Sequence, residues 1–161
     1  ADSLLYDELV RKQGLTGDLS AGINWGLGGM FDYSGPMLWM AQVFHDAGTP
    51  SEKVIAAIDT VVERLRSAPL DEATLERARV KMRSSLYGDL ESFAGFGRAN
   101  VLASFALFDD DPGRINRLEA EFAKVTPALV HETAREFLRP GNRTIYTIEP
   151  GKTAPAKGGA R

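Results

Sequence analysis

The chain has 161 residues, of which 43% are hydrophobic and 25% are charged, and its formal net charge is −3 at pH 7. This size and composition are typical of a globular domain with a core of its own, and no apolar run approaches the roughly 20 residues of a membrane-spanning helix. Scattered basic residues on an acidic chain exclude a nucleic-acid interface, and the absence of cysteine excludes disulfides and thiolate sites.

The first predicted element is a short helix over residues 3–13. Its apolar side chains recur at helical spacing, and they are Leu4, Leu5, Leu9 and Val10. Gly14 follows as a left-handed stop. Because the chain opens inside this helical pattern, we expect the domain to lack its opening elements.

Two strands are predicted next. Apolar and polar residues alternate from Leu19 to Tyr33, which predicts a long half-buried strand, or a hairpin arm with a bulge near Gly28 and Gly29. Residues 34–36 are a turn signal. The segment MLWMAQVF, residues 37–44, is apolar on both faces, as an interior strand covered by helices would be.

Five helical segments are predicted from residue 50 to residue 139. Capping and proline signals mark where they begin, and these residues are Thr49, Pro50, Asp71, Asp111, Pro112, Thr126 and Pro127. The pattern of residues 98–108 predicts a well-buried helix. It lies between the helix that starts at Asp71 and the one that starts at Asp111. The side chains expected in the core are Val54, Ile58, Val61, Leu65, Leu75, Ala78, Met82, Leu86, Ile115, Leu118 and Phe122.

The closing segment NRTIYTIEP, residues 142–150, is rich in β-branched residues and predicts a last strand. Residues 151–161 have no apolar face and predict a disordered tail. The order of elements predicts an α+β fold over residues 1–150, a single two-layer domain with helices on one face of a small, mostly antiparallel sheet. Three strands are few for this many helices, so we expect part of the sheet to come from outside this sequence.

The string HETAR, residues 131–135, is one histidine short of the zinc-peptidase signature His-Glu-x-x-His, because Arg135 stands at the last position. The other histidine, His45, lies far away in the sequence just before a predicted loop. Zinc needs three or four converging ligands. We therefore interpret His131 as an ordinary, partly exposed helix residue whose neighbours Glu132 and Arg135 can pair along the helix.

Other catalytic patterns are weaker still. The sequence has no Gly-x-Ser-x-Gly elbow and no Gly-x-Gly-x-x-Gly loop that opens a helix. The acidic run at residues 109–111 is compatible with a cation site, but a solvated loop with a helix cap is the favoured interpretation. The basic residues Arg77, Arg79, Lys81 and Arg83 fall on several helical faces and are expected to be solvent charges. No catalytic, cofactor-binding or metal-binding residue is predicted.

Three segments, taken in order, resemble the insulinase/pitrilysin family of zinc peptidases, which includes mitochondrial processing peptidase. They are SLLYDELVRKQGL (residues 3–15), PLDEATLERARVKMRSSL (residues 69–86) and VTPALVHETAREFLRPGNRTIYTIEP (residues 125–150). The resemblance implies a processing-peptidase-like domain. It also implies that zinc is held elsewhere, by a His-x-x-Glu-His motif that this sequence lacks, so the chain is similar to the non-catalytic C-terminal-type domain.

The resemblance also identifies two substrate-facing positions. Active members of the family have an arginine and a tyrosine that reach toward the zinc-bound substrate, and the matching positions here are Val10 and Gly17. Neither side chain can donate a hydrogen bond. Arg11 points about 100° away around an α-helix and would not substitute without a change of register.

These observations give three hypotheses. The first is the non-catalytic half of a zinc endopeptidase, which helps to enclose extended peptides while a partner domain or subunit supplies zinc. The second is a purely structural partner subunit of the same family, with no proteolytic role. The third is an unrelated α+β binding module. Bacterial proteins of this family type are often exported, so the resemblance implies a periplasmic location rather than a cytoplasmic one.

Overall fold

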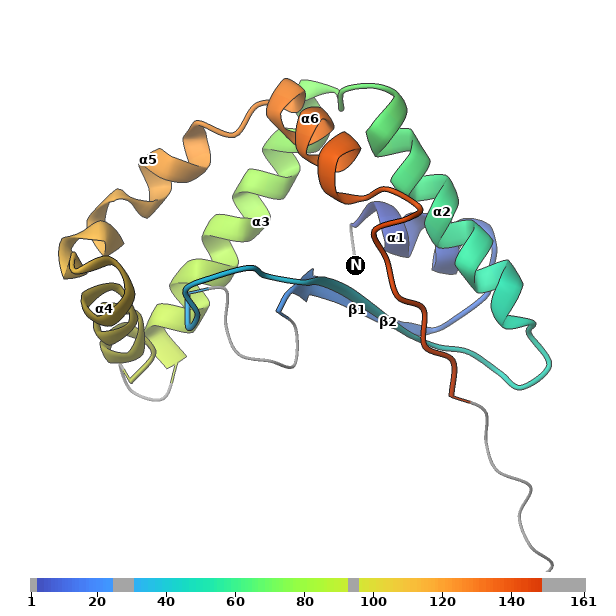
Figure 1. Ribbon diagram of the computed structural model, residues 1–161, viewed down its shortest axis with the longest axis horizontal. Helices are drawn as coiled ribbons and strands as arrows, with labels where there is room; N and C mark the ends of the chain where they lie inside the picture. Colours follow the sequence, from blue (N-terminus) through green and yellow to red (C-terminus); the bar gives the residue numbers. More distant parts are fainter. Residues whose placement is uncertain (1–2, 25–30, 93–95, 149–161) are drawn as a thin grey trace, which may run out of the picture.

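The computed structural model describes residues 3–24, 31–92 and 96–148. Over these residues the chain has the predicted α+β fold, in which six α-helices pack against a two-stranded antiparallel sheet (Figure 1). The elements in chain order are α1 (Leu4–Tyr6), a π-helical segment η1 (Asp7–Lys12), β1 (Asp18–Ile23), β2 (Trp39–Phe44), α2 (Ser51–Ser67), α3 (Glu72–Glu91), α4 (Phe96–Asp109), a 3-10 segment η3 (Pro112–Arg117), α5 (Leu118–Ala123) and α6 (Pro127–Phe137).

The predicted N-terminal helix is present, but it is not a regular α-helix. Ser3 caps α1 by accepting a hydrogen bond from the Tyr6 N–H at 3.2 Å. In η1 the hydrogen bonds span five residues instead of four, as in the 3.1 Å bond from the Gln13 N–H to the Glu8 carbonyl. Gly14 then ends the helix with a φ of +59°, as predicted.

The first strand is shorter than predicted. β1 ends at Ile23 because Asn24 adopts a left-handed φ of 50°, and its side-chain oxygen accepts a hydrogen bond from the Leu38 N–H at 2.9 Å. Residues 31–33 do not continue the strand, since Phe31 packs against the ring of Phe105 instead. The bulge predicted at residues 28–29 lies outside the described residues.

The helices cover only part of one face of the sheet. The cross-strand pair Leu19–Val43 contacts the cluster formed by Leu9, Val54 and Ala57. The next pairs on the same face, Ala21–Ala41 and Ile23–Trp39, are exposed. The prediction that β2 is an interior strand covered on both faces is therefore wrong for the described structure, because the helical cover ends after the first pair.

Two of the predicted helix caps are confirmed. The Asp71 carboxylate accepts from the Thr74 N–H at 2.8 Å, and the Thr126 hydroxyl accepts from the Leu129 N–H at 3.1 Å. At α2 the cap is Pro50 rather than Thr49, because Pro50 keeps an extended backbone with a ψ of 132° and the helix begins one residue later.

The second core lies between α3, α4 and α5. Its buried members are Leu86, Leu90, Val101, Phe105 and Leu118, and Ile115 and Phe122 pack against them. Ala78 and Met82 of α3 are exposed, contrary to prediction, because α4 and α5 contact only one side of that helix. The helix predicted over residues 98–108 is also less buried than expected, since Leu107 is 75% and Phe108 38% exposed.

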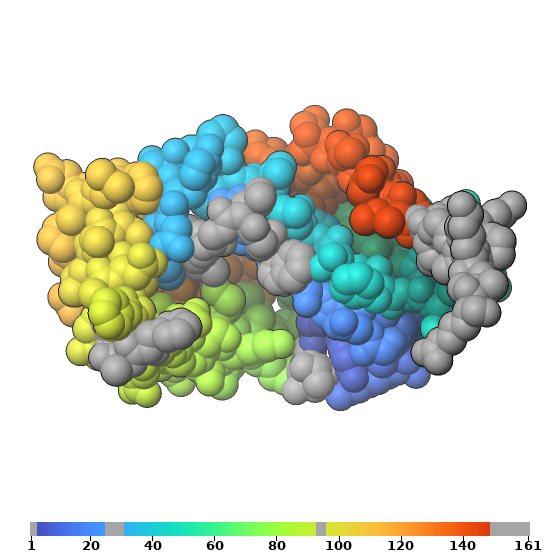
Figure 2. Space-filling model, turned by 90° about the horizontal axis from the view of Figure 1, so that it is seen from below, coloured from blue at the N-terminus to red at the C-terminus, as the bar shows by residue number. Residues whose placement is uncertain are grey.

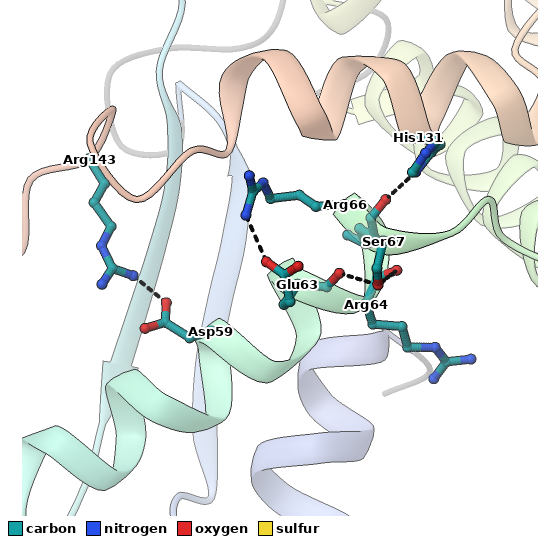
Figure 3. A network of polar contacts seen from close by, with 8 residues as sticks. Asp59, Glu63, Arg64, Arg66, Ser67, His131 and Arg143 are labelled. Atoms are coloured by element: carbon teal, nitrogen blue, oxygen red, sulfur yellow. Dashed lines mark hydrogen bonds and ion pairs between the residues drawn. The ribbon is translucent and has the colours of Figure 1, made fainter.

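The predicted closing strand does not form among the described residues. Residues 142–148 run in an extended path along α2 without pairing to the sheet (Figure 1). The segment is held at its start, where Arg143 forms an ion pair with Asp59 of α2 (Figure 3). Its apolar residues Ile145 and Ile148 are exposed. A β-rich pattern predicts an extended backbone, but a strand also needs a partner.

Candidate functional site

The first candidate region is the uncovered part of the sheet. Besides Ile23 and Trp39, large apolar side chains are exposed at Met37 and Leu38 before β2 and at Phe44 at its end, and Phe44 is 60% exposed. Side chains alternate along a strand, so Trp39 lies on the helix-facing side of the sheet and Phe44 on the opposite side. Exposed apolar groups at both ends of one short hairpin are typical of a surface that binds another polypeptide.

The two family positions lie close to this hairpin. Val10 is half-buried in η1, and Gly17 is exposed in the loop that leads into β1. A Cβ atom added at Gly17 would have no heavy atom within 4 Å, so a larger side chain has room there. Neither residue supplies a hydrogen-bonding side chain, as the sequence indicates.

Arg11 is placed differently from the sequence-based expectation. A π-helical turn takes up one residue more than an α-helical turn, so η1 shifts the angular positions of the side chains that follow Asp7. Arg11 therefore lies between the angular positions that residues 10 and 11 would occupy in an α-helix. Its guanidinium carbon lies 5.6 Å from the centre of the Tyr6 ring, and its side chain is 53% exposed.

The HETAR string is an ordinary part of α6. The His131 Nδ1–H donates a 3.0 Å hydrogen bond to the Leu65 carbonyl near the end of α2, which joins the two helices (Figure 3). The ring is half-buried. Glu132 and Arg135 are exposed, and the ion pair predicted between them does not form in the described structure.

The residues present do not fit a zinc site. His45, in the loop after β2, donates through Nδ1 to the Asp46 carbonyl at 3.1 Å and lies 3.3 Å from the Ser51 hydroxyl. His45 and His131 thus make hydrogen bonds on separate elements of the fold. Within residues 3–24, 31–92 and 96–148 no three histidine or carboxylate side chains are grouped so that they could hold a metal ion.

The acidic run at residues 109–111 begins at the end of α4, and two of its carboxylates, those of Asp109 and Asp111, pair with arginines. Arg114 lies 2.7 Å from the Asp109 carboxylate and 3.1 Å from that of Glu121, and hydrogen bonds to these two groups raise its pKa. Asp111 pairs with Arg117 and makes no side-chain cap, contrary to prediction. The solvated-loop interpretation fits this arrangement better than a cation site does.

One residue that the sequence interpretation missed is Arg79. Instead of a solvent charge, it is a half-buried link whose guanidinium lies 2.8 Å from Glu72 and 2.9 Å from Glu76. It also donates to the Val125 carbonyl at 2.5 Å, which connects α3 to the start of α6. The glutamates three and seven residues earlier indicate in the sequence that Arg79 can form ion pairs. The contact to Val125 spans 46 positions, so the sequence gives no local signal for it.

Comparison of the chain with protein-family models, curated proteins and solved structures finds no match. The likeness to the insulinase/pitrilysin family therefore depends on the three sequence segments alone. None of the helices in the described residues is long and apolar enough to cross a membrane.

Proposed function

We propose that this chain is the non-catalytic half of an insulinase-type zinc metalloendopeptidase. In this proposal it forms part of the wall of a chamber that encloses extended peptides, while another domain or subunit supplies the zinc site. The observation that supports it best is the uncovered helix-facing side of the sheet, at Ala21–Ala41 and Ile23–Trp39. The three family-like segments, in the order of the family, provide the class of enzyme.

The chain would contribute binding surface and no reacting group. An exposed tryptophan and isoleucine on a sheet can contact the apolar side chains of an extended peptide, whatever its sequence. Arg11 is the candidate for a cross-chamber cation, because η1 moves it toward the position that the family gives to arginine. The family has a tyrosine at the position of Gly17, and the sequence identifies no other residue that could replace it.

Zinc calorimetry tests the non-catalytic assignment. We expect no stoichiometric, tight zinc binding by the chain, and the same result for Arg135→His, because a two-histidine pair on this helix lacks the further ligands that zinc needs. The Arg135→Ala variant is the matched control for loss of the arginine. Tight one-to-one binding by the unmodified chain would contradict the proposal.

The alternative is a purely structural subunit of the same family, and the residues Val10 and Gly17 favour it. A protein that carries His-x-x-Glu-His and is encoded beside this chain is the partner to test. If cleavage of an unfolded peptide requires both chains and falls at least about tenfold with Arg11→Ala but not with Arg11→Lys, the enzyme proposal is supported. Cleavage that is independent of this chain would favour the structural role.

We also propose a periplasmic location, which follows from the resemblance alone. Fractionation of cells that produce the full-length protein tests it, and recovery with cytoplasmic markers would contradict it.

A further inference from the structure

Among the described residues, the outer edge of β2 has no backbone hydrogen-bond partner. The Asn24 N–H donates to the Leu38 carbonyl at 2.7 Å, one position beyond the last pair of the ladder, so the backbone groups at this position point across the hairpin. Hydrogen-bonded and non-hydrogen-bonded pairs alternate in an antiparallel ladder. The pairs that contain Trp39, Ala41 and Val43 are then non-hydrogen-bonded, so the N–H and C=O groups of these three residues point away from β1. We call these groups the β2 edge.

The strand β2 itself lacks the charged residues, proline and bulge that usually block an exposed edge. The sequence WMAQVF contains no charged residue and no proline, and β2 makes no bulge in its register with β1. The side chains of Trp39 and Phe44, on opposite faces of β2, are exposed. A two-stranded hairpin of this kind is marginally stable alone, so an added strand would stabilise it.

The segment of residues 142–148 lies on the same side. In Figures 1 and 2 it passes beside the β2 side of the hairpin, and in Figure 2 β2 lies between it and β1. Apart from the turn at Asn142, its backbone makes no hydrogen bond to other described residues. This side of the hairpin therefore offers a second run of unpaired, extended backbone close to the β2 edge.

We propose that the β2 edge binds one extended strand of a partner polypeptide, which adds to the sheet next to β2. Only another extended backbone can pair with donors and acceptors that recur at every second residue. The partner strand is expected to be uncharged and rich in β-branched residues, because its side chains would lie against Trp39 on one face and Phe44 on the other. A second copy of the whole chain fits less well, since residues 142–148 of both copies would then lie on this side of the hairpin.

This inference does not depend on the proposed zinc-peptidase function, because it follows from the register and the exposure of β2. A failure of peptide cleavage with a catalytic partner would therefore leave it standing, and a failure of strand binding would leave the zinc prediction standing.

Amide hydrogen exchange, followed by NMR on the isotope-labelled full chain, tests the proposal. In the free protein the amides of Met40, Gln42 and Phe44, which bond to β1, should exchange slowly, whereas those of the β2 edge should exchange fast. The probe is an excess of the neutral peptide acetyl-Thr-Val-Thr-Val-Thr-Val-Thr-amide. We expect it to slow exchange at the β2 edge by at least about tenfold.

Two matched variants distinguish the β2 edge from the other edge of the hairpin. Ala41→Pro removes one outward N–H from β2, and Ala21→Pro removes its cross-strand counterpart on β1; neither N–H bonds across the hairpin. Protection by the peptide should disappear in Ala41→Pro and remain in Ala21→Pro. If Ala41→Pro does not fold, the exchange measurement on the unmodified chain still tests the proposal.

Three outcomes would overturn it. The peptide leaves exchange at the β2 edge unchanged, or Ala21→Pro abolishes the protection while Ala41→Pro keeps it. The third is slow exchange at the β2 edge without peptide, together with a dimer in sedimentation experiments that Ala41→Pro dissociates, which would identify a second copy as the occupant.

Discussion

Replacing Phe105 by alanine should destabilise the fold strongly. The Phe105 ring is 2% exposed, meets the Phe31 ring edge to face with centroids 5.2 Å apart, and has the Arg114 guanidinium 4.9 Å from its centre. Truncation of a buried phenylalanine costs about 3–5 kcal/mol, of which the aromatic pair accounts for about 0.5–1.5 kcal/mol. We expect a loss near 4 kcal/mol, a large part of the ~5–15 kcal/mol that stabilises a typical domain.

The matched control is Phe96→Ala on the same helix, because that ring is 75% exposed and its removal should change stability by less than about 0.5 kcal/mol. Urea unfolding, followed by far-ultraviolet circular dichroism, gives both values. A double-mutant cycle with Phe31→Ala should return a coupling of about 1 kcal/mol. If Phe105→Ala and Phe96→Ala lower the unfolding free energy equally, α4 does not bury the face that the structure shows.

Three further predictions concern the ends of elements, and urea unfolding checks each of them. Gly14→Ala should cost about 1–2 kcal/mol because Gly14 has a φ of +59°, whereas Gly17→Ala, which meets no atom within 4 Å, should cost clearly less. Thr126→Ala should cost about 1 kcal/mol by removing the cap of α6, and Thr126→Ser should be nearly neutral. Hydrogen bonds from the Thr74 hydroxyl and N–H lower the pKa of Asp71, so its stabilisation should be full above about pH 4 and disappear as the pH falls through the lower folded-state pKa. The stability difference between the unmodified chain and Asp71→Ala should therefore shrink with acidification, and an unchanged difference would contradict this assignment.

The features that the sequence predicted well are those decided within a few residues. Asp71 and Thr126 find their hydrogen-bond partners three residues later, and Gly14 needs only its own left-handed backbone. Both partners of each interaction lie within a few residues of each other, so a short stretch of sequence is enough to predict it. The α+β class follows in the same way from the order of helical and alternating segments.

The features predicted poorly depend on distant partners. The alternation that continues to Tyr33 looks like strand, yet Phe31 turns toward a helix more than 70 positions later. Residues 142–148 have a strand composition but pair with no strand in the described structure. Arg79 is another example, because its contact to Val125 could not be inferred from helical periodicity.

The candidate site shows the same division at finer scale. The absence of donors at Val10 and Gly17 is a property of composition, so the sequence states it correctly. The position of Arg11 is a property of helix register, and the π-helical bonds of η1 that change it have no sequence rule as reliable as a cap. A single extra residue per turn is enough to decide which side chain faces a partner.

The strand WMAQVF combines both kinds of inference. Its apolar faces and lack of charge predict a strand covered on both sides, whereas among the described residues it is an exposed edge. Exposed edges in natural proteins usually have a lysine, a proline or a bulge, because an unguarded edge pairs with other chains. An unguarded composition is therefore more consistent with a strand that is covered in the protein's working state than with a permanently free one. The sequence-based expectation of a fuller sheet and the observed open edge therefore concern the same strand. The expectation describes β2 with a further strand beside it, and the structure describes β2 without one.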